Sequence, residues 1–244
     1  AREIQRAMLP SSSSYVLNNF SFNSEYMPAD KISGDFYDRF KIDDQHVGFY
    51  IADVAGHGVS AAMLTLYIKQ CIESRRTIDK NSDLISFPSV VIKYLFDAFN
   101  GANFKVEIYF VILYAILNIE TGRMILCSAG MNTTPVLIKP DGEIKEIQLE
   151  GLPICKLKDV LEFDYVDTFL NLEKGDKMFF YTDGLVDAQN IDKERYSEKR
   201  LYNVLASNCK EPGEVIRRKV TEDLKEFIGE KKIKDDITFF VIEI

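Results

Sequence analysis

The stretch IADVAGHGVSAAML, residues 51–64, decides the fold that the sequence predicts. It completes an apolar run that carries one acid, Asp53, and then passes through glycines into a segment with helical spacing. A carboxylate at the end of a buried strand loses its water and stays ionised only beside a positive partner. We therefore expect a strand, a glycine turn and a helix here, with Asp53 facing a cation.

The composition limits the classes of function. The chain has 244 residues, of which 46% are hydrophobic, and its 38 acidic and 30 basic residues give a net charge of −8. A chain of this size can bury a large core, but its acidic balance disfavours a nucleic-acid binder, which usually presents a basic face. The longest apolar run, residues 108–117, is shorter than the roughly 20 residues of a membrane-spanning helix. No charged-then-apolar signal peptide begins the chain.

The four cysteines lie far apart, without a C-x-x-C pair, so the spacing excludes a zinc ribbon or a redox pair. They are Cys71, Cys127, Cys155 and Cys209. In a chain of this length they indicate free thiols, and free thiols are typical of the cytoplasm. We therefore expect a cytoplasmic protein.

The first residues, AREIQRAML, have a helical pattern that ends at Pro10 and a serine run. Two interpretations stay open: a frayed terminal helix, or the end of a linker from an upstream domain, paired in a dimer. Because the chain begins without Met, we expect a fragment of a longer protein. The predicted division is a linker end at 1–14 and one domain at 15–244.

The middle and the end of the chain predict mainly strands, with two helices early and two late. Strands are expected at 20–28, 33–42, 47–54, 106–119, 123–130, 134–139, 143–149, 177–181 and 236–244, and helices at 61–76, 87–100, 197–208 and 211–228. The first of these helices has its apolar stripe at Ala62, Met63, Leu66, Tyr67 and Ile72. Tight turns and grouped helices predict an α+β fold with mainly antiparallel sheets.

Acids recur where the predicted strands begin or end. They are Asp35 in SGDFYD, Asp53 in ADVAGHG, Asp183 in YTDGLVDA, and Asp235 and Asp236 in KDDITFFVI. Carboxylate and backbone carbonyl oxygens are the ligands that a hard divalent cation prefers, and glycine lets the backbone approach it closely. Each acid taken alone is more typical of a turn residue than of a metal ligand. The EF-hand calcium pattern is absent.

The order of the motifs is more specific than any one of them. G-D-x-x-D, then D-V-x-G-H-G before a helix, then T-D-G, then a terminal D-D-I-T resembles the metal-dependent protein phosphatases of the 2C type. The bacterial branch with sporulation stage II phosphatase E and the sigma-factor-regulator phosphatases is most similar, over roughly 20–244. SGDFYD also partly matches the GG[DE]EF signature of diguanylate cyclases, but Phe36 replaces the second acid and the cyclase order of elements is missing.

The resemblance implies two antiparallel sheets packed as a sandwich, flanked by helices, with a two-metal site at one edge. It implies that Asp35 binds one metal, that Asp53 bridges both, and that the carbonyl of Val54 adds a ligand. It also implies that Asp183 and Asp235 complete the coordination of the other metal. Asp236 matches a family position that more often supports the neighbouring acid, Asp235, than binds metal itself. Mn²⁺ or Mg²⁺ suits such an all-oxygen site.

The function implied is a protein serine/threonine phosphatase that acts through a metal-activated water on a phosphorylated regulatory protein, such as an anti-sigma-factor antagonist. The expected partners are this substrate, an upstream sensory domain acting through residues 1–9, and a possible second copy; no nucleic acid or membrane is expected. His57 is either a general acid or a loop residue. Two alternatives stay open: a catalytically weak or inactive phosphatase-like signalling module, and a metal-dependent phosphodiesterase or nuclease.

Overall fold

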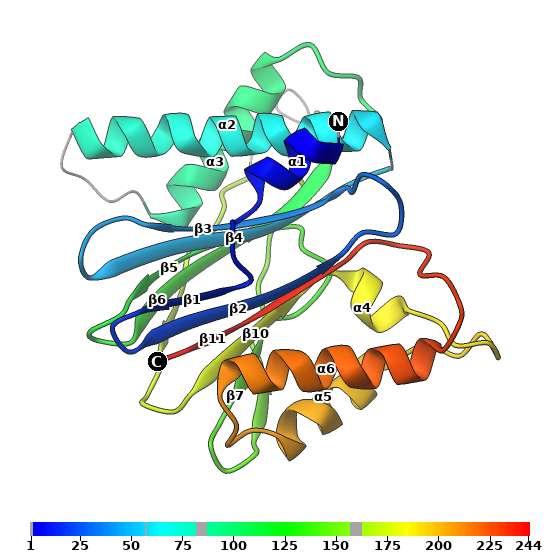
Figure 1. Ribbon diagram of the computed structural model, residues 1–244. Coiled ribbons are helices and arrows are strands. Elements are labelled where there is room, and N and C mark those ends of the chain that lie inside the picture. Colours follow the sequence, from blue (N-terminus) through cyan, green and yellow to red (C-terminus); the bar gives the residue numbers. More distant parts are fainter. Residues whose placement is uncertain (1, 57, 82–86, 157–162) are drawn as a thin grey trace. The chain divides into compact units, whose positions relative to one another are not determined.

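The computed structural model describes residues 2–56, 58–81, 87–156 and 163–244 (Figure 1). The chain divides into two compact units, each built from segments that are distant in sequence. The first unit comprises residues 1–9, 32–131 and 149–171, and the second comprises 10–31, 132–148 and 172–244. Each unit contains one antiparallel sheet with its own helices. The predicted α+β class with two antiparallel sheets is confirmed.

The first unit contains a five-stranded sheet in the order β3-β4-β5-β6-β9. The strands are β3 (Asp35–Lys41), β4 (His46–Val54), β5 (Phe110–Asn118), β6 (Arg123–Ala129) and β9 (Thr168–Asn171), and the helices are α1 (Arg2–Met8), α2 (Val59–Asn81) and α3 (Pro88–Gly101). Helices α2 and α3 lie over one face of this sheet (Figure 1).

Helix α2 buries a different stripe from the predicted one. Leu64, Ile68 and Ile72 recur at helical spacing and are at most 5% exposed, whereas Met63 is 65% exposed. Burying each large aliphatic side chain stabilises the fold by about 1.5–3 kcal/mol. Ala62 and Ile72 were predicted correctly and are 5% and 1% exposed, but Leu66 and Tyr67 are only half-buried and Met63 is exposed.

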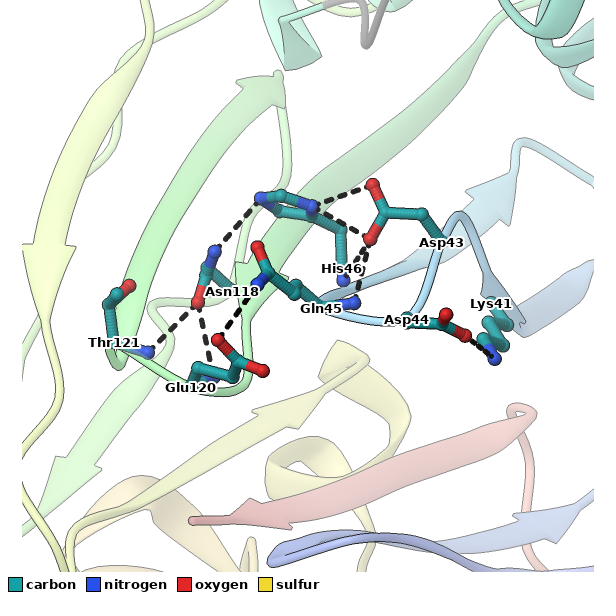
Figure 2. A network of polar contacts seen from close by, with 8 residues as sticks. All are labelled: Lys41, Asp43, Asp44, Gln45, His46, Asn118, Glu120 and Thr121. Carbon is teal, nitrogen blue, oxygen red and sulfur yellow. Dashed lines mark hydrogen bonds and ion pairs between the residues drawn. The ribbon is translucent and has the colours of Figure 1, made fainter.

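A polar network at the turns fixes the register of β3, β4 and β5 (Figure 2). The carboxylate of Asp43 accepts hydrogen bonds from the N–H groups of Gln45 and His46, at 2.8 and 2.7 Å, and also contacts His46 Nδ1. Asn118 Nδ2 lies 3.1 Å from His46 Nε2, so the side chain of Asn118 ties β5 to this turn. A slip of one residue would turn every side chain of a strand to the opposite face of the sheet. By fixing the register at the turn, this network helps to decide which residues of β3 and β4 face each other at the other end of these strands.

The second unit contains a six-stranded sheet in the order β1-β2-β11-β10-β7-β8. Its strands are β1 (Ser14–Leu17), β2 (Phe20–Met27), β7 (Val136–Ile138), β8 (Ile144–Glu146), β10 (Lys177–Tyr181) and β11 (Ile237–Glu243), and its helices are α4 (Asp183–Asp187), α5 (Ser197–Ser207) and α6 (Gly213–Ile228). Helices α5 and α6 bury their apolar faces on this sheet (Figure 1). Strand β11 pairs with both β2 and β10, which brings the end of the chain beside an early strand.

Three elements of the structure were not expected from the sequence: β1, β9 and α4. In the part of the chain that the structure describes, no helix is both long and apolar enough to cross a bilayer.

Candidate metal centre

In the first unit, Asp35 and Asp53 face each other across the β3–β4 pair. Asp35 is 2% exposed and Asp53 is half-buried. Like charges directly opposite each other in an antiparallel pair repel, and burial adds the cost of lost hydration. A cation between the two carboxylates would remove both penalties.

Oxygen atoms approach Gly34 closely beside this pair, and only a residue without a side chain leaves them room. A Cβ atom at position 34 would lie 2.9 Å from the carbonyl oxygen of Val54, 3.3 Å from that of Gly56 and 3.7 Å from Asp53 Oδ1. The N–H of Val54 donates to the carbonyl of Gly34 at 3.2 Å, which holds the two segments together. Carboxylate and carbonyl oxygens are the donors that Mg²⁺ and Mn²⁺ prefer, so the residues present fit the expected ions.

In the second unit, Asp183 and Asp235 lie near each other because β10 and β11 are antiparallel. Tyr181 pairs with Phe239 in the register, so the end of β10 lies beside the start of β11. Gly184 packs so tightly here that a Cβ atom would fall 2.0 Å from the carbonyl oxygen of Asp236. Only glycine fits this contact.

Neighbouring acids affect Asp235. Burial raises the pKa of Asp235 above its ordinary value; the hydrogen bond from the N–H of Asp236 lowers it, and the carboxylates of Asp183, Asp236 and Asp187 raise it again. The net pKa of Asp235 is raised, as expected for a carboxyl that lies near other acids. Asp236 has a different hydrogen-bond partner from Asp235: its Oδ1 accepts a hydrogen bond from the N–H of Ala29 at 2.8 Å.

The structure therefore brings the predicted acids together as two pairs, one within each unit: Asp35 with Asp53, and Asp183 with Asp235. Over the described ranges, no group of three or more His, Cys, Asp or Glu side chains is arranged to hold a metal ion. His57 lies outside the described residues.

Two amide side chains beside these acids were missed from the sequence. Asn132 Nδ2 donates to Asp183 Oδ2 at 2.6 Å. Gln5 is 4% exposed, and its side-chain amide bonds the backbone of Ser33, two residues before Asp35. Asn132 lies next to the segment SAGM, which could have drawn attention to it, but the helical pattern around Gln5 gives no such signal.

The fold is the one found in PP2C phosphatase domains. The structure of the SiaA-PP2C domain of Pseudomonas aeruginosa is similar with a TM-score of 0.84 at 20% identity, over 100% of this chain and 94% of that one. The catalytic domain of the serine/threonine protein phosphatase PstP, solved in complex with two manganese ions, is similar with a TM-score of 0.61 at 12% identity, over 92% of this chain and 97% of that one. The predicted fold is thereby confirmed.

The sequence narrows this class to one family. The profile described as Stage II sporulation protein E (SpoIIE) matches residues 43–244, and the chain belongs to this family. Phosphoserine phosphatase RsbU of Bacillus subtilis is 26% identical over 218 residues, which cover 88% of this chain and 61% of RsbU. Protein IcfG of Synechocystis sp. is 25% identical over 261 residues, covering 99% of this chain and 40% of IcfG. The chain thus spans about half the length of these curated relatives.

Proposed function

We propose that this chain is the catalytic domain of a metal-dependent protein serine/threonine phosphatase. The observation that carries the proposal is the pair Asp35 and Asp53, two opposed carboxylates beside the backbone oxygens that approach Gly34. Two comparisons support the same function: the chain belongs to the SpoIIE family, and its relative RsbU is a phosphoserine phosphatase.

The proposed ligands of the two expected Mn²⁺ or Mg²⁺ ions are given for each unit by itself. They are Asp35, Asp53 and the carbonyl of Val54 in the first unit, and Asp183 and Asp235 in the second. When bound, such a pair lowers the pKa of a water molecule towards neutrality and offsets the charge of the phosphoryl group.

Other side chains keep these ligands in position. Asn132 orients the carboxylate of Asp183, and Asp236 holds the backbone at Ala29 while it supports Asp235. Asp38 on β3 bonds Lys69 of α2 at 2.5 Å, and both side chains are mostly buried. This ion pair fastens the strand that starts with Asp35 to the helix that follows Asp53.

The proposed substrate is phosphoserine or phosphothreonine on a regulatory protein, such as an anti-sigma-factor antagonist. We further propose that residues 1–14 end a linker from an upstream sensory domain, that 15–244 form the catalytic domain, that the full protein acts in the cytoplasm, and that two copies can pair. A catalytically weak signalling module remains the alternative function.

Turnover of p-nitrophenyl phosphate with and without Mn²⁺ tests the proposal. We expect metal-dependent hydrolysis that Asp53→Asn lowers at least 100-fold, because a bridging ligand is lost. Asp44→Asn is the matched control, since Asp44 lies in a turn of the same unit with its side chain 94% exposed. Absence of turnover with any divalent ion favours the signalling module, and a preference for a phosphodiester favours the nuclease class.

A further inference from the structure

A pocket of about 210 Å³ in the second unit is lined by cations although the chain as a whole is acidic. Its basic residues are Arg195, Lys231, Lys232 and Lys234, and its wall includes Gly184 and Asp235. The pocket thus adjoins the acids proposed to hold metal.

Two acids, Asp187 and Asp235, also line the pocket, so its four basic residues leave an excess of positive charge. Arg195 pairs with Asp187 at 2.9 Å. Lys231, however, donates to the carbonyl of Asn190 at 2.6 Å, and Lys234 lies 3.4 Å from Gln189 Oε1, so both bond uncharged acceptors. Lys232 is exposed.

We propose that this cationic pocket, defined by Lys231, Lys232 and Lys234, binds acidic residues that flank the phosphorylated residue of a protein substrate. The inference rests on the proposed function and specifies its substrate class: a phosphorylated segment with Asp or Glu beside the phosphorylated position. Complementary charge favours such a segment over neutral or basic ones and speeds its encounter. Because Lys232 and Lys234 are exposed, each ion pair that they form contributes only about 0.2–1 kcal/mol and weakens with salt.

The test uses three phosphoserine peptides that differ only in flanking Glu, Gln or Lys. With the Mn²⁺-loaded chain at low salt, we expect kcat/KM to be about 5- to 10-fold higher for the Glu peptide than for the Gln peptide, from two such pairs. The double variant Lys232→Gln/Lys234→Gln should bring this ratio close to one. Lys199→Gln/Lys210→Gln makes the same charge change at exposed positions of the same unit outside the pocket, and should keep the ratio.

Equal kcat/KM for the three peptides, or an unchanged ratio in the Lys232/Lys234 double variant, overturns the proposal. Fluorescence anisotropy of the same labelled peptides measures binding without turnover. If p-nitrophenyl phosphate and the peptides are not hydrolysed but the Glu peptide still binds best through the lysines, the proposed function fails and the binding surface stands. Equal binding of all three peptides rejects the surface by itself.

A second inference comes from the buried amide of Gln5 on α1. Gln5 Nε2 donates to the carbonyl of Ser33 at 2.7 Å, and the N–H of Ser33 donates to Gln5 Oε1 at 3.1 Å. The same Nε2 lies 3.3 Å from Thr65 Oγ1 on α2. Ser33 Oγ in turn accepts the N–H of Asp35 at 3.0 Å. All four residues are at most 4% exposed.

We infer that Gln5 is a positioning residue for Asp35. Its amide clamps both backbone polar groups of Ser33, and Ser33 fixes the backbone where β3 begins. A buried backbone group that loses its partner costs about 1–3 kcal/mol, so Gln5→Leu should let the segment before Asp35 shift. Because the contact is to the main chain of Ser33, no substitution at position 33 removes it, and Gln5 itself must be changed.

Mn²⁺ titration by calorimetry tests this role without turnover. We expect Gln5→Leu and Gln5→Glu to weaken Mn²⁺ binding about 10-fold, since neither side chain can donate to Ser33. Gln70→Leu, at an exposed position on α2, should leave it unchanged. Ile92→Val removes a buried methyl group from α3, and this control loses stability but should keep the Mn²⁺ affinity. Unchanged affinity in both Gln5 variants, or an equal loss in Ile92→Val, overturns the inference; absence of Mn²⁺ binding in the unmodified chain instead rejects the proposed metal centre.

Discussion

Replacing Asp53 with asparagine separates the electrostatic cost of the opposed carboxylates from their role as ligands. Asp53 and Asp35 are a directly opposed pair, so their Cβ atoms are about 5 Å apart. At an effective dielectric constant of about 20, two charges at that distance repel by roughly 3 kcal/mol. Cross-strand measurements give about 0.2–1 kcal/mol, and we take about 1 kcal/mol because Asp53 is only half-buried.

In a chain of 244 residues, 1 kcal/mol shifts the unfolding midpoint by about 2–4 °C. We therefore expect Asp53→Asn to melt about 2–4 °C higher than the unmodified chain in EDTA. Mn²⁺ at about 100 times its Kd stabilises the unmodified chain by roughly 2.7 kcal/mol, and the variant should lose this gain.

Thermal unfolding by calorimetry, with EDTA and with Mn²⁺, measures both effects, and Asp44→Asn serves as the control with the same change of charge. The reasoning is refuted if Asp53→Asn is less stable than the unmodified chain in EDTA and still gains stability from Mn²⁺.

Three further predictions concern the surroundings of the site and the stability of each unit. Gly34→Ala places a methyl group 2.9 Å from the carbonyl oxygen of Val54, so it should destabilise the fold by about 1–3 kcal/mol and weaken Mn²⁺ binding at least 10-fold. Calorimetry measures both effects, and a variant with unchanged stability and Mn²⁺ affinity would contradict the close approach of these oxygens to position 34. Lys69→Met leaves the carboxylate of Asp38 buried without its cation, so it should destabilise the chain by about 3–5 kcal/mol in denaturant unfolding; a loss below about 1 kcal/mol would mean that this pair does not anchor β3. Although burial raises the pKa of Asp223, the two hydrogen bonds from Arg200, at 2.8 and 3.0 Å, bring it below its ordinary 3.8. The stability from this lowered pKa is present above pH 3.8 and is lost as the pH falls through the folded value, so Asp223→Asn should flatten the acid-side loss of stability measured below about pH 4, and an unchanged acid limb contradicts that assignment.

The acids at strand ends could be predicted because two local signals agree at three of the sites, those of Asp35, Asp53 and Asp183. An apolar run with period two gives the strand, and an adjacent glycine marks the point where the chain turns. The structure places Asp35 and Asp53 opposite each other at such ends.

The orientation of helices could not be read from periodicity alone. In α1, the apolar Ile4 is 58% exposed, whereas the polar Gln5 is buried. A polar side chain can be buried when its bonds are satisfied, and the partner Ser33 lies 28 residues away. A local pattern carries no information about such a distant partner.

Short elements were missed for a related reason. Helix α4 has five residues, fewer than two turns, so Thr182–Asp183–Gly184 reads as a turn in the sequence. Strand β9 alternates between half-buried and exposed residues, and Phe169 is 65% exposed at the edge of its sheet. Helix α4 is too short, and β9 too exposed, to produce a periodic signal.

The central claim is that Asp35 and Asp53 share a divalent ion. Crystals grown with Mn²⁺ and measured at its absorption edge test this most directly, because anomalous scattering locates the ion independently of activity. The account predicts a peak in bonding contact with a carboxylate oxygen of each aspartate, and none at that place in Asp53→Asn crystals. A Mn²⁺-saturated crystal with no peak touching both side chains would contradict it.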